Sequence, residues 1–577
     1  MTNVSNLLLE RLAAVGVKTF FGVQGGACAH LIEAACLNGD TQFIPVLNEQ
    51  AAGLSAHGHY FSSGKSAGAM VTTGPGFFNL MTGIAACYYD DVPAVFLCGQ
   101  VNAGLNMAQE FGVKMYGFQE TPHAEIAAHI ADTCLKVRND EELRTALAAI
   151  ETLGHGTITG PLVLEIQDDY QRNDFSEDAV EASVPVPADE TLTGLDHDLK
   201  DVISALQRSR KPLLVIGGGV MRSSEPIEVA LDAVSASLDI PVTFSWGGQR
   251  FYRTDNANHV GLFGTHSPGV GNSLVQSCDL LIGVGVSLLQ HQAGKVKDQF
   301  APQADILVVN REPQETTRYH HDYGNRISVI TADSAQFLCQ LADYLKTHKP
   351  NTTYWPEISR TENRRDWASG VDRDLYAKLK THEPVKALAE ILQACPKDYW
   401  AFSDAGATLS WTYQAASICD SPPITTAFNL HAMGYALPAA VGAAVACDRP
   451  GILSISGDGG FLMNVQELAV AIGCQVPIKV VVIDNEGYGI IRQTQDTFLG
   501  GRYFGSDKGA FPSLPNYRIA EIIKGFGFEV LESGSENAAD TARWLFEKQS
   551  GHRAVIIKVD PKTEVEGVAP KYAPLAF

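Results

Sequence analysis

The segment 452–487, ILSISGDGGFLMNVQELAVAIGCQVPIKVVVIDNEG, decides the fold because each of its two short apolar runs ends in a polar cluster. The runs, 452–456 and 478–483, have the length and composition of buried strands in a parallel sheet. Residues 461–472 between them are rich in helix formers, so the segment predicts one strand–helix–strand unit. Parallel strands then place both polar clusters at one edge of the sheet, where α/β proteins bind ligands.

The two clusters, Gly457-Asp458-Gly459-Gly460 and Asp484-Asn485-Glu486-Gly487, predict a site for a diphosphate and a metal ion. The glycines allow the backbone to approach a diphosphate closely. Asp458 and the amide oxygen of Asn485 are hard ligands suited to Mg²⁺. A tight turn at Gly-Asp-Gly and a capping role for Asn485 explain the same residues without a ligand. The rest of the chain must therefore decide between the two interpretations.

The 27-residue spacing from Asp458 to Asn485 resembles the Gly-Asp-Gly and Asn-Asn motif of thiamine diphosphate (ThDP) enzymes. The resemblance implies that Asp458, the Asn485 side chain and the Gly487 carbonyl bind Mg²⁺. The first Asn of the motif is Asp484 here, which adds negative charge at a position that is not the usual ligand. Further cofactor contacts are expected from Asp404, Gly406, Gly459, Gly460, Tyr488 and Ile490.

Residues 44–101 supply the second half that such a site needs. An apolar run at 44–47 leads into a small-residue helix that begins near Glu49, and Thr72-Thr73-Gly74-Pro75-Gly76 precedes a helix opening at Asn79. A lone Glu at such a junction is usually only a first-turn charge favoured by the helix dipole. From Leu47 to Val101, however, the chain resembles the pyrimidine-binding domain of the acetohydroxyacid (acetolactate) synthase family.

The resemblance implies that Glu49 is the catalytic carboxylate, hydrogen-bonded to the cofactor's aminopyrimidine, and that Gly74 and Asn79 bind the cofactor. The chemistry requires such a group, because the thiazolium carbon is a weak acid and needs an internal base beside it. A partly buried carboxylate keeps a proton available near neutral pH. The cofactor ring then accepts the electrons released when a 2-keto acid loses CO₂.

The segment 429–438, NLHAMGYALP, resembles the family's GTMGxxLPAA. Met433 is then the apolar residue beneath the bent cofactor, and the backbone carbonyl of His431 contacts the pyrimidine amine. The family usually has Gly at this position, so the His431 side chain is expected to narrow the substrate entrance.

Gln24, in a GVQGG loop that resembles the family's FGxPGG, and Gln119, in a matching FQE, are the candidate catalytic residues near the substrate. The Gln24 side chain either faces the reacting carbonyl or caps the next helix. No His-His pair of the pyruvate decarboxylase type is present, which favours carboligation over aldehyde release. Thr494 stands where the synthases have a Trp that favours 2-ketobutyrate, which indicates a different acceptor.

Segments 110–119 and 487–495 look closer to acetolactate synthase-like proteins such as the YerE-type enzymes, which attach an acetyl branch to a keto sugar. We therefore expect a 2-keto acid donor, pyruvate first, with the acceptor open between a keto acid and a larger ketone such as a keto sugar. The alternatives are a ThDP-dependent C–C lyase or hydrolase without decarboxylation, and a non-catalytic relative. The family places the cofactor between two subunits, which implies a homodimer at least and usually a homotetramer.

The 577 residues suggest an α/β protein of three domains with doubly wound, Rossmann-like parallel sheets. Polar seams at about 173–195 and 346–382 give a pyrimidine-binding domain at 1–185, a central domain at 190–350 and a diphosphate-binding domain at 370–577.

The central domain opens with a strand and glycine turn at 212–219, as in dinucleotide folds, and 261–266 resembles the family's GMxGxHG. In the synthases this domain binds FAD. Residues 285–294 lack the family's arginine, and 309–312 depart from its Ile-Asp-Ile-Asp. FAD, ADP or no nucleotide therefore stay open for this domain.

Composition agrees with a cytoplasmic enzyme. The formal net charge of −22 disfavours nucleic acid and anionic membranes as partners. No apolar run reaches the roughly 18 residues of a membrane span, and the N-terminus predicts an amphipathic helix in place of a signal peptide. The 11 scattered cysteines, without a C-x-x-C pair, indicate reduced thiols.

Overall fold

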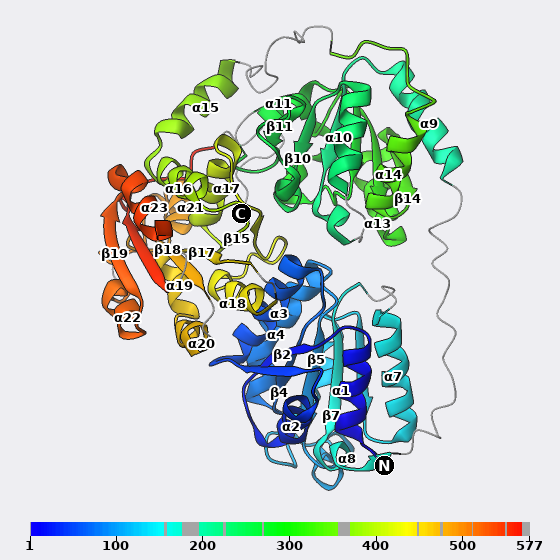
Figure 1. The fold of residues 1–577 in the computed structure, drawn as a ribbon, viewed down its shortest axis with the longest axis vertical. Coiled ribbons are helices and arrows are strands. Elements are labelled where there is room, and N and C mark those ends of the chain that lie inside the picture. The colour runs from blue at the N-terminus through cyan, green and yellow to red at the C-terminus, as the bar shows by residue number, and fades with distance from the viewer. Residues whose placement is uncertain are drawn as a thin grey trace.

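The computed structural model describes residues 2–154, 159–175, 195–222, 227–267, 270–355, 370–446, 449–473, 477–509, 512–547 and 551–567. These residues form three α/β domains, each built on a six-stranded sheet (Figure 1). Most of the seam expected at 173–195, and the part of the second seam at 356–369, lie outside the described residues. The predicted fold class, an α/β protein of three domains, is confirmed. The exact limits of the domains stay predictions.

The N-terminal domain lies at the bottom of Figure 1, in blue and cyan. Its parallel sheet contains β2 (Thr19–Gly22), β3 (Gln42–Pro45), β4 (Gly68–Val71), β5 (Val95–Gln100), β6 (Thr133–Val137) and β7 (Leu162–Gln167). Its helices are α1 (Val4–Ala14), α2 (Ala29–Leu37), α3 (Glu49–Ser63), α4 (Pro75–Tyr89), α5 (Ala108–Phe111), α6 (His123–Ala127), α7 (Asp140–Gly154) and α8 (Asp168–Gln171). The short strands β1 (Thr2–Asn3) and β8 (Asp174–Phe175) pair antiparallel beside it.

The central domain is the green part of Figure 1. Its parallel sheet contains β9 (Pro212–Ile216), β10 (Val242–Phe244), β11 (His259–Leu262), β12 (Leu280–Val284), β13 (Asp305–Asn310) and β14 (Ile327–Thr331). Its α-helices are α9 (Asp196–Arg208), α10 (Ile227–Leu238), α11 (Val270–Ser277), α12 (Gln290–Ala293), α13 (Pro313–Tyr323) and α14 (Ser334–Tyr344), and two 3-10 helices, η5 (Gly218–Arg222) and η6 (Trp246–Phe251), follow β9 and β10.

The C-terminal domain, coloured from yellow-green to red, lies beside the other two. Its sheet contains β15 (Trp400–Ser403), β16 (Ile424–Thr425), β17 (Ile452–Gly457), β18 (Ile478–Asp484), β19 (Glu529–Gly534) and β20 (Arg553–Lys558), all parallel. Its helices are α15 (Gly370–Thr381), α16 (Glu383–Ala394), α17 (Ala407–Ile418), α18 (Ala436–Ala446), α19 (Asp458–Met463), α20 (Glu467–Gly473), α21 (Gly489–Leu499), α22 (Ile519–Gly525) and α23 (Ala538–Glu547).

The outer domains share one strand order, and the central domain has another. With strands numbered along each domain, the N-terminal and C-terminal sheets both have the order 2-1-3-4-6-5. The central sheet has the order 3-2-1-4-5-6, which is typical of dinucleotide-binding domains. The chain therefore repeats one fold around an inserted Rossmann-type domain.

Two predicted helix boundaries were wrong. The helix expected at 461–472 is two helices: α19 begins at Asp458, and a break follows at Asn464, whose side chain bonds the Gly434 carbonyl at 2.8 Å. The helix expected to open at Asn79 begins at Pro75, because proline favours the first helical position. Tertiary contacts and local turn chemistry, which the periodicity does not contain, set both ends.

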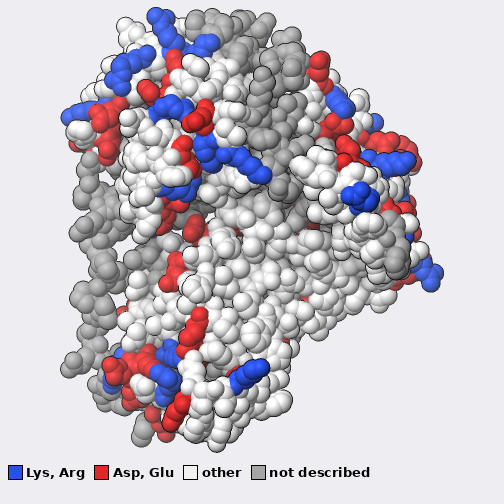
Figure 2. Space-filling model, turned by 180° about the vertical axis from the view of Figure 1, so that it is seen from behind, with Lys and Arg blue, Asp and Glu red and all other residues white. Residues whose placement is uncertain are grey.

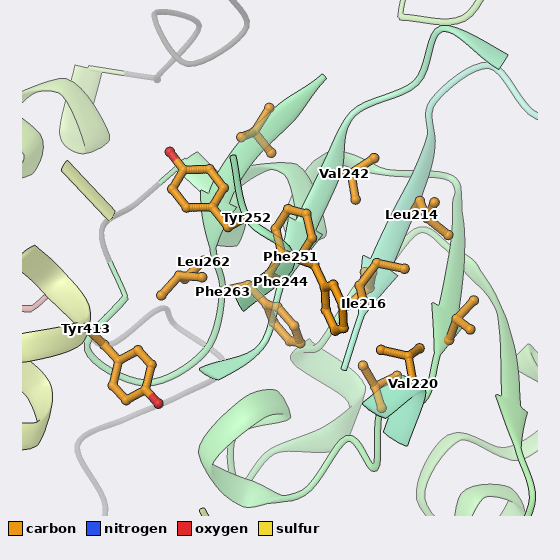
Figure 3. Packing of buried hydrophobic residues seen from close by; sticks show 14 of the residues in the cluster. Leu214, Ile216, Val220, Val242, Phe244, Phe251, Tyr252, Leu262, Phe263 and Tyr413 are labelled. Carbon is orange, nitrogen blue, oxygen red and sulfur yellow. The ribbon is translucent and has the colours of Figure 1, made fainter. Parts of the chain in front are cut away.

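The sheets are buried between helices, and the cores of neighbouring domains meet. In the central domain Leu214, Ile216, Val242 and Phe244 of β9 and β10 pack against Phe251 of η6, as Figure 3 shows. Tyr413 of α17 belongs to the same buried cluster and joins the central domain to the C-terminal domain. No helix among the described residues is both long and apolar enough to cross a membrane, and no disulfide joins the cysteines described there.

Helices α3 and α18 form the closest contact between the outer domains. An ideal Cβ on Gly58 would lie 2.2 Å from the Ala439 carbonyl oxygen, and one on Gly442 would lie 1.9 Å from that of Ser55. Only glycine therefore fits at these two points. The Ser55 hydroxyl also donates to the Pro438 carbonyl at 2.9 Å.

Asp90, directly after α4, fastens the turn that precedes Met433. Its buried carboxylate accepts the backbone N–H groups of Phe428 at 2.7 Å and Asn429 at 3.0 Å. The same carboxylate lies 3.0 Å from His57 Nε2, and His57 Nδ1 lies 2.9 Å from the Tyr435 hydroxyl. This network fixes the 428–435 segment against the N-terminal domain.

Replacing Asp90 by Ala is expected to cost about 3 kcal/mol of stability, because buried backbone N–H groups lose their acceptor. The midpoint of thermal unfolding should fall clearly in the Asp90→Ala protein. It should fall less in the Asp90→Asn protein, which keeps one acceptor oxygen. Asp40→Ala, at an exposed turn, serves as the matched control. Equal midpoints for the Asp90→Ala and Asp40→Ala proteins would contradict this role for the network.

Candidate active site

The predicted residues of the C-terminal domain meet at the carboxyl edge of its sheet. Gly406 follows β15, Asp458 follows β17 and Asn485 follows β18. These strands are neighbours, so three separate loops face one cavity of about 610 Å³. The predicted residues that line it are Gly406, His431, Met433, Asp458, Gly459, Gly460, Asn485, Gly487, Tyr488 and Ile490.

Asp404 lies behind this cavity and not in its lining. Its carboxylate accepts the backbone N–H groups of Ala405 at 2.8 Å and Gly434 at 3.0 Å. Complete burial raises the pKa of Asp404 to about 6, although these N–H groups oppose the shift. The structure therefore places Asp404 where it holds the turn after Met433.

The glycines of the first cluster leave no room for side chains. An ideal Cβ on Gly459 would lie 2.3 Å from the Tyr488 ring, and one on Gly460 would lie 2.9 Å from the Asp404 carboxylate. Gly457 is the N-cap of α19, so the helix begins at the cavity wall and directs its first N–H groups there. A backbone cradle at a helix start suits a diphosphate.

The predicted metal ligands offer a donor set that fits Mg²⁺. Asp458 and Asn485 are both almost fully buried, and Gly487 adopts φ +149°, a conformation accessible to glycine. Burial, followed by the nearby charge of Asp484, raises the pKa of Asp458 to about 7. One carboxylate, one amide and one carbonyl leave positions for water and phosphate oxygens, as Mg²⁺ prefers.

No cluster of three or more His, Cys, Asp or Glu side chains suited to a metal occurs in the part of the chain that the structure describes. Those residues therefore offer no site of the kind that transition metals prefer. The oxygen donors of Asp458, Asn485 and Gly487 are the candidate metal site.

Asp484, the departure from the Asn-Asn motif, is neutralised by a partner. Its carboxylate forms an ion pair with Lys558 at the end of β20 and accepts the Glu486 N–H at 3.1 Å. The extra charge is thus directed to a lysine on the neighbouring strand, which explains how the motif accommodates an aspartate.

Arg492 is a supporting residue that motif reading did not assign. The buried guanidinium donates to the Asn485 carbonyl at 2.8 Å and pairs with Asp507 at 3.2 Å. Because Glu486 is held at φ +60°, the loop after β18 needs such support. Its position seven residues after Asn485, one helical turn into α21, was the available signal.

The predicted residues of the N-terminal domain gather at the matching edge of its own sheet. Glu49 begins α3 after β3, and the Asn79 side chain donates to its Oε2 at 3.0 Å. Gly76 lies beside Oε1, since an ideal Cβ there would be 3.4 Å away. The carboxylate is therefore oriented by α4 and is partly exposed.

Gln24, Gly74 and Gln119 lie along the same edge. Gln24 is exposed in the loop after β2. Gly74 is the N-cap of α4 at φ +69°, and an ideal Cβ there would be 2.9 Å from the Cβ of Gln119. Gln119 itself has φ +63°, and its carbonyl accepts the Thr73 hydroxyl at 2.8 Å. The structure thus places these candidates at the same sheet edge as Glu49, with Gln119 packed against Gly74.

The two half-sites do not share a cavity within one chain. All residues that line the 610 Å³ cavity belong to the central and C-terminal domains. The central domain contributes Trp246, Thr265, His266, Gln290, His291, Gly294 and Lys295. Trp246 and His291 were not predicted as site residues: Trp246 belongs to none of the recognised motifs, and His291 lies in the 285–294 segment, which was considered only for FAD binding.

The fold and the two edges together fit a cofactor-dependent α/β enzyme, with a glycine-rich turn and oxygen donors on one domain and a carboxylate on a second domain of the same fold. Comparison with known families agrees with this class. Residues 2–134 match "Thiamine pyrophosphate enzyme, N-terminal TPP binding domain", residues 199–341 match its "central domain" and residues 404–559 match its "C-terminal TPP binding domain".

Curated relatives cover most of the chain. The acetolactate synthase large subunit of Pyropia yezoensis is 30% identical over 506 residues, covering 86% of this chain and 82% of the relative. That of Porphyra purpurea is 30% identical over 536 residues, covering 90% and 86%. Acetolactate synthase isozyme 2 large subunit of Escherichia coli (strain K12) is 29% identical over 507 residues, covering 87% and 86%. The chain belongs to the acetolactate synthase-like family of ThDP enzymes.

Replacing Gly459 by Ala is expected to weaken ThDP binding by roughly tenfold, because the new methyl group overlaps the Tyr488 ring at the cradle. Isothermal titration with ThDP in the presence of Mg²⁺ measures this. Gly473→Ala is the matched control, since a Cβ there meets no atom within 4 Å. If both variants bind ThDP as tightly as the wild type, Gly459 is not part of the cradle.

Proposed function

We propose that the chain catalyses ThDP- and Mg²⁺-dependent decarboxylation of a 2-keto acid, pyruvate first, and transfers the activated aldehyde to a carbonyl acceptor. The observation that carries this proposal is the pairing of two edges: the Asp458, Asn485 and Gly487 oxygens at one sheet, and Glu49 at the same edge of a sheet with the same strand order. The names of the relatives support the reaction class.

The protein residues have separable tasks in this reaction. The Glu49 carboxylate holds and moves the proton at the cofactor's aminopyrimidine, and Asn79 fixes its orientation through the 3.0 Å hydrogen bond. Met433 and Ile490, which line the cavity, would provide an apolar surface for the cofactor. Bound ThDP supplies the nucleophilic carbon and the electron sink for loss of CO₂. Gln24 and Gln119 orient the substrate beside it.

The acceptor side of the proposal rests on Thr494. Its hydroxyl donates to the Ile490 carbonyl at 3.0 Å, within α21; Ile490 lines the 610 Å³ cavity, and Thr494 is not among the described residues that line it. A threonine is smaller than a Trp and leaves more room at this position. We therefore include a larger ketone, such as a keto sugar, beside a second keto acid among the acceptors.

A second function, a non-decarboxylating C–C lyase or hydrolase, uses the same cofactor and the same residues. Release of CO₂ on mixing with pyruvate separates the two functions. A non-catalytic role is disfavoured because Glu49 and the metal ligands are all present in suitable positions.

Replacing Glu49 by Gln is expected to lower the rate of CO₂ release from pyruvate by about 10²- to 10⁴-fold, because the amide cannot take the proton. ThDP binding should persist, since the diphosphate cradle lies on another domain. Glu33→Gln, an exposed carboxylate on α2, is the control. Full activity of the Glu49→Gln protein would refute this assignment, and absence of CO₂ from the wild type would refute the pyruvate reaction.

The active unit in this proposal is a homodimer in which the N-terminal domain of one subunit completes the cavity of the other. Exposed apolar side chains occur near both half-sites and include Leu47, Phe78, Phe111, Phe118, Met463, Ile491, Phe498 and Phe504. Figure 2 shows a broad face almost without charged residues across the N-terminal and C-terminal domains. Such a face favours burial against a second subunit.

A mixture of Glu49→Gln and Asp458→Asn subunits tests the shared site. Each homodimer should be inactive, while a mixed dimer contains one site with both residues intact. After dissociation and random reassociation, about a quarter of the wild-type activity should return, because half of the dimers are mixed and each has one working site. If a site belonged to a single chain, mixing would restore nothing.

FAD in the central domain has weaker support. A second cavity of about 630 Å³ lies at the ends of β9, β10, β12 and β13, beside glycines of the expected turn. Among the described residues its lining includes one arginine, Arg311, and five acidic residues, Asp90, Asp91, Asp132, Glu312 and Glu315. This charge does not suit the diphosphate of a dinucleotide. No step of the proposed reaction uses a flavin, and the visible absorption spectrum of the purified protein decides its presence.

A further inference from the structure

Two histidines from different domains meet in the 610 Å³ cavity, at the end where the central domain supplies the lining. His431 precedes Met433 in the C-terminal domain, and His291 belongs to α12 of the central domain. Their ring centroids are 6.1 Å apart, edge to face. The Trp246 ring lies 6.0 Å from His431 and 6.3 Å from His291. Both histidines stand at positions where the sequence departs from its family pattern.

Trp246 is a fixed wall behind this pair. Its ring stacks on Tyr413 of α17 with centroids 5.0 Å apart and planes inclined by only 9°. The central domain therefore reaches the cavity through a rigid aromatic contact with the C-terminal domain, and the position of His291 is tied to it. The Thr265 N–H donates to the His291 carbonyl at 2.8 Å, which fixes the backbone as well.

His431 keeps its side chain at a conformational cost. Its φ of +52° lies in the left-handed region, where glycine is favoured and a residue with a Cβ is strained. A strained non-glycine residue in a binding cavity points to a use for its side chain. The His431 ring lies against Trp246 and His291. A residue that served only to make a turn would not need this side chain.

The paired rings have hydrogen-bonding capacity left over. Within the described part of the chain, neither imidazole forms a hydrogen bond to another protein group through its ring nitrogens, and both residues keep some contact with solvent. Burial lowers the pKa of His291 to about 4 and also lowers that of His431. Both are therefore neutral at pH 7, and each offers one N–H donor and one nitrogen acceptor.

The charges of the residues that line the 610 Å³ cavity indicate whether an anionic or an uncharged acceptor binds there. Carboxylates are commonly held by arginine, which binds them in a bidentate manner. No arginine occurs among the described lining residues of this cavity, and its one lysine, Lys295, is exposed to solvent. The asparagine and glutamine that share this end, Asn429 and Gln290, are uncharged. This end of the cavity thus suits an uncharged polar group.

We propose that His291 and His431, with Trp246 behind them, form the acceptor subsite and select an uncharged, hydroxylated carbonyl compound over a 2-keto acid anion. This inference rests on the proposed function, since it names the acceptor class of the same site. The imidazoles hydrogen-bond the carbonyl and hydroxyl oxygens of the acceptor, and the indole packs against its carbon atoms. The two histidines are specificity-determining residues, and the donor reaction depends on Glu49.

The test compares two four-carbon acceptors, erythrulose, which is neutral and hydroxylated, and 2-ketobutyrate, which is an anion. To keep 2-ketobutyrate from reacting as a donor, every variant carries Glu49→Gln and is loaded with ThDP and Mg²⁺, and each compound is titrated in the absence of pyruvate while tryptophan fluorescence is followed. Trp246→Phe identifies the part of the signal that comes from Trp246. His291→Phe removes the hydrogen bonds at similar size, His291→Gln restores part of them, and His321→Gln, an exposed histidine on α13, is the control.

Erythrulose should saturate the Trp246 signal at a lower concentration than 2-ketobutyrate. His291→Phe should raise the concentration needed for erythrulose by roughly tenfold, with partial rescue in His291→Gln and no change in His321→Gln. Tighter binding of 2-ketobutyrate, or equal erythrulose binding by the Glu49→Gln parent protein and its His291→Phe variant, would overturn the proposal. Failure of the proposed function is seen separately, as absence of CO₂ from pyruvate, and leaves this binding test decisive.

Discussion

The contact between α3 and α18 is the constraint on which both half-sites depend. Helix α3 begins at Glu49, and α18 begins three residues after Met433. The two helices meet so closely at Gly58 and Gly442 that no other side chain fits. Their relative position is therefore fixed by backbone contact, which allows far less adjustment than contacts between long side chains. Any shift of one helix moves a catalytic segment of its own domain against the other domain.

The same contact has a further consequence in a dimer. Within one chain, Glu49 and Met433 are linked by α3 and α18, yet in the proposed assembly they serve different active sites. Glu467 adds to this link, because its buried carboxylate accepts the Leu47 N–H at 3.2 Å, two residues before Glu49. Burial raises the pKa of Glu467 to about 7. The two sites of a dimer would thus be joined through the interior of each subunit.

The sequence was sufficient for those parts of the site that depend on the ends of parallel strands. Asp458 and Asn485 follow adjacent strands, so the strand–helix–strand pattern alone brings them to one edge. Gly74 and Glu49 follow from the same rule in the N-terminal domain. The meeting of these residues at one edge was therefore predictable from local periodicity, while their role as metal ligands stays a prediction.

Contacts between distant segments could not be read in this way. Lys558, which neutralises Asp484, comes from a strand 74 residues further along the chain. Asn464 ends α19 because its side chain reaches Gly434, whereas the residues around it favour a continuous helix. The meeting of His291 with His431 depends on how two domains pack, and no periodicity in either segment contains that information. Each of these features is a tertiary contact that overrides or supplements a local preference.

The central domain shows how these two kinds of information combine. Its strand order is that of a dinucleotide-binding sheet, but the cavity at the ends of its strands is shared with the N-terminal domain, and the acidic residues that line it do not suit a diphosphate. Trp246 and His291 line both this cavity and the cofactor cavity. The fold thus brings the loops after β10 and β12 to the wall between the two spaces, whatever occupies the central one. Architecture places these loops, and their side chains determine what the adjoining active site accepts.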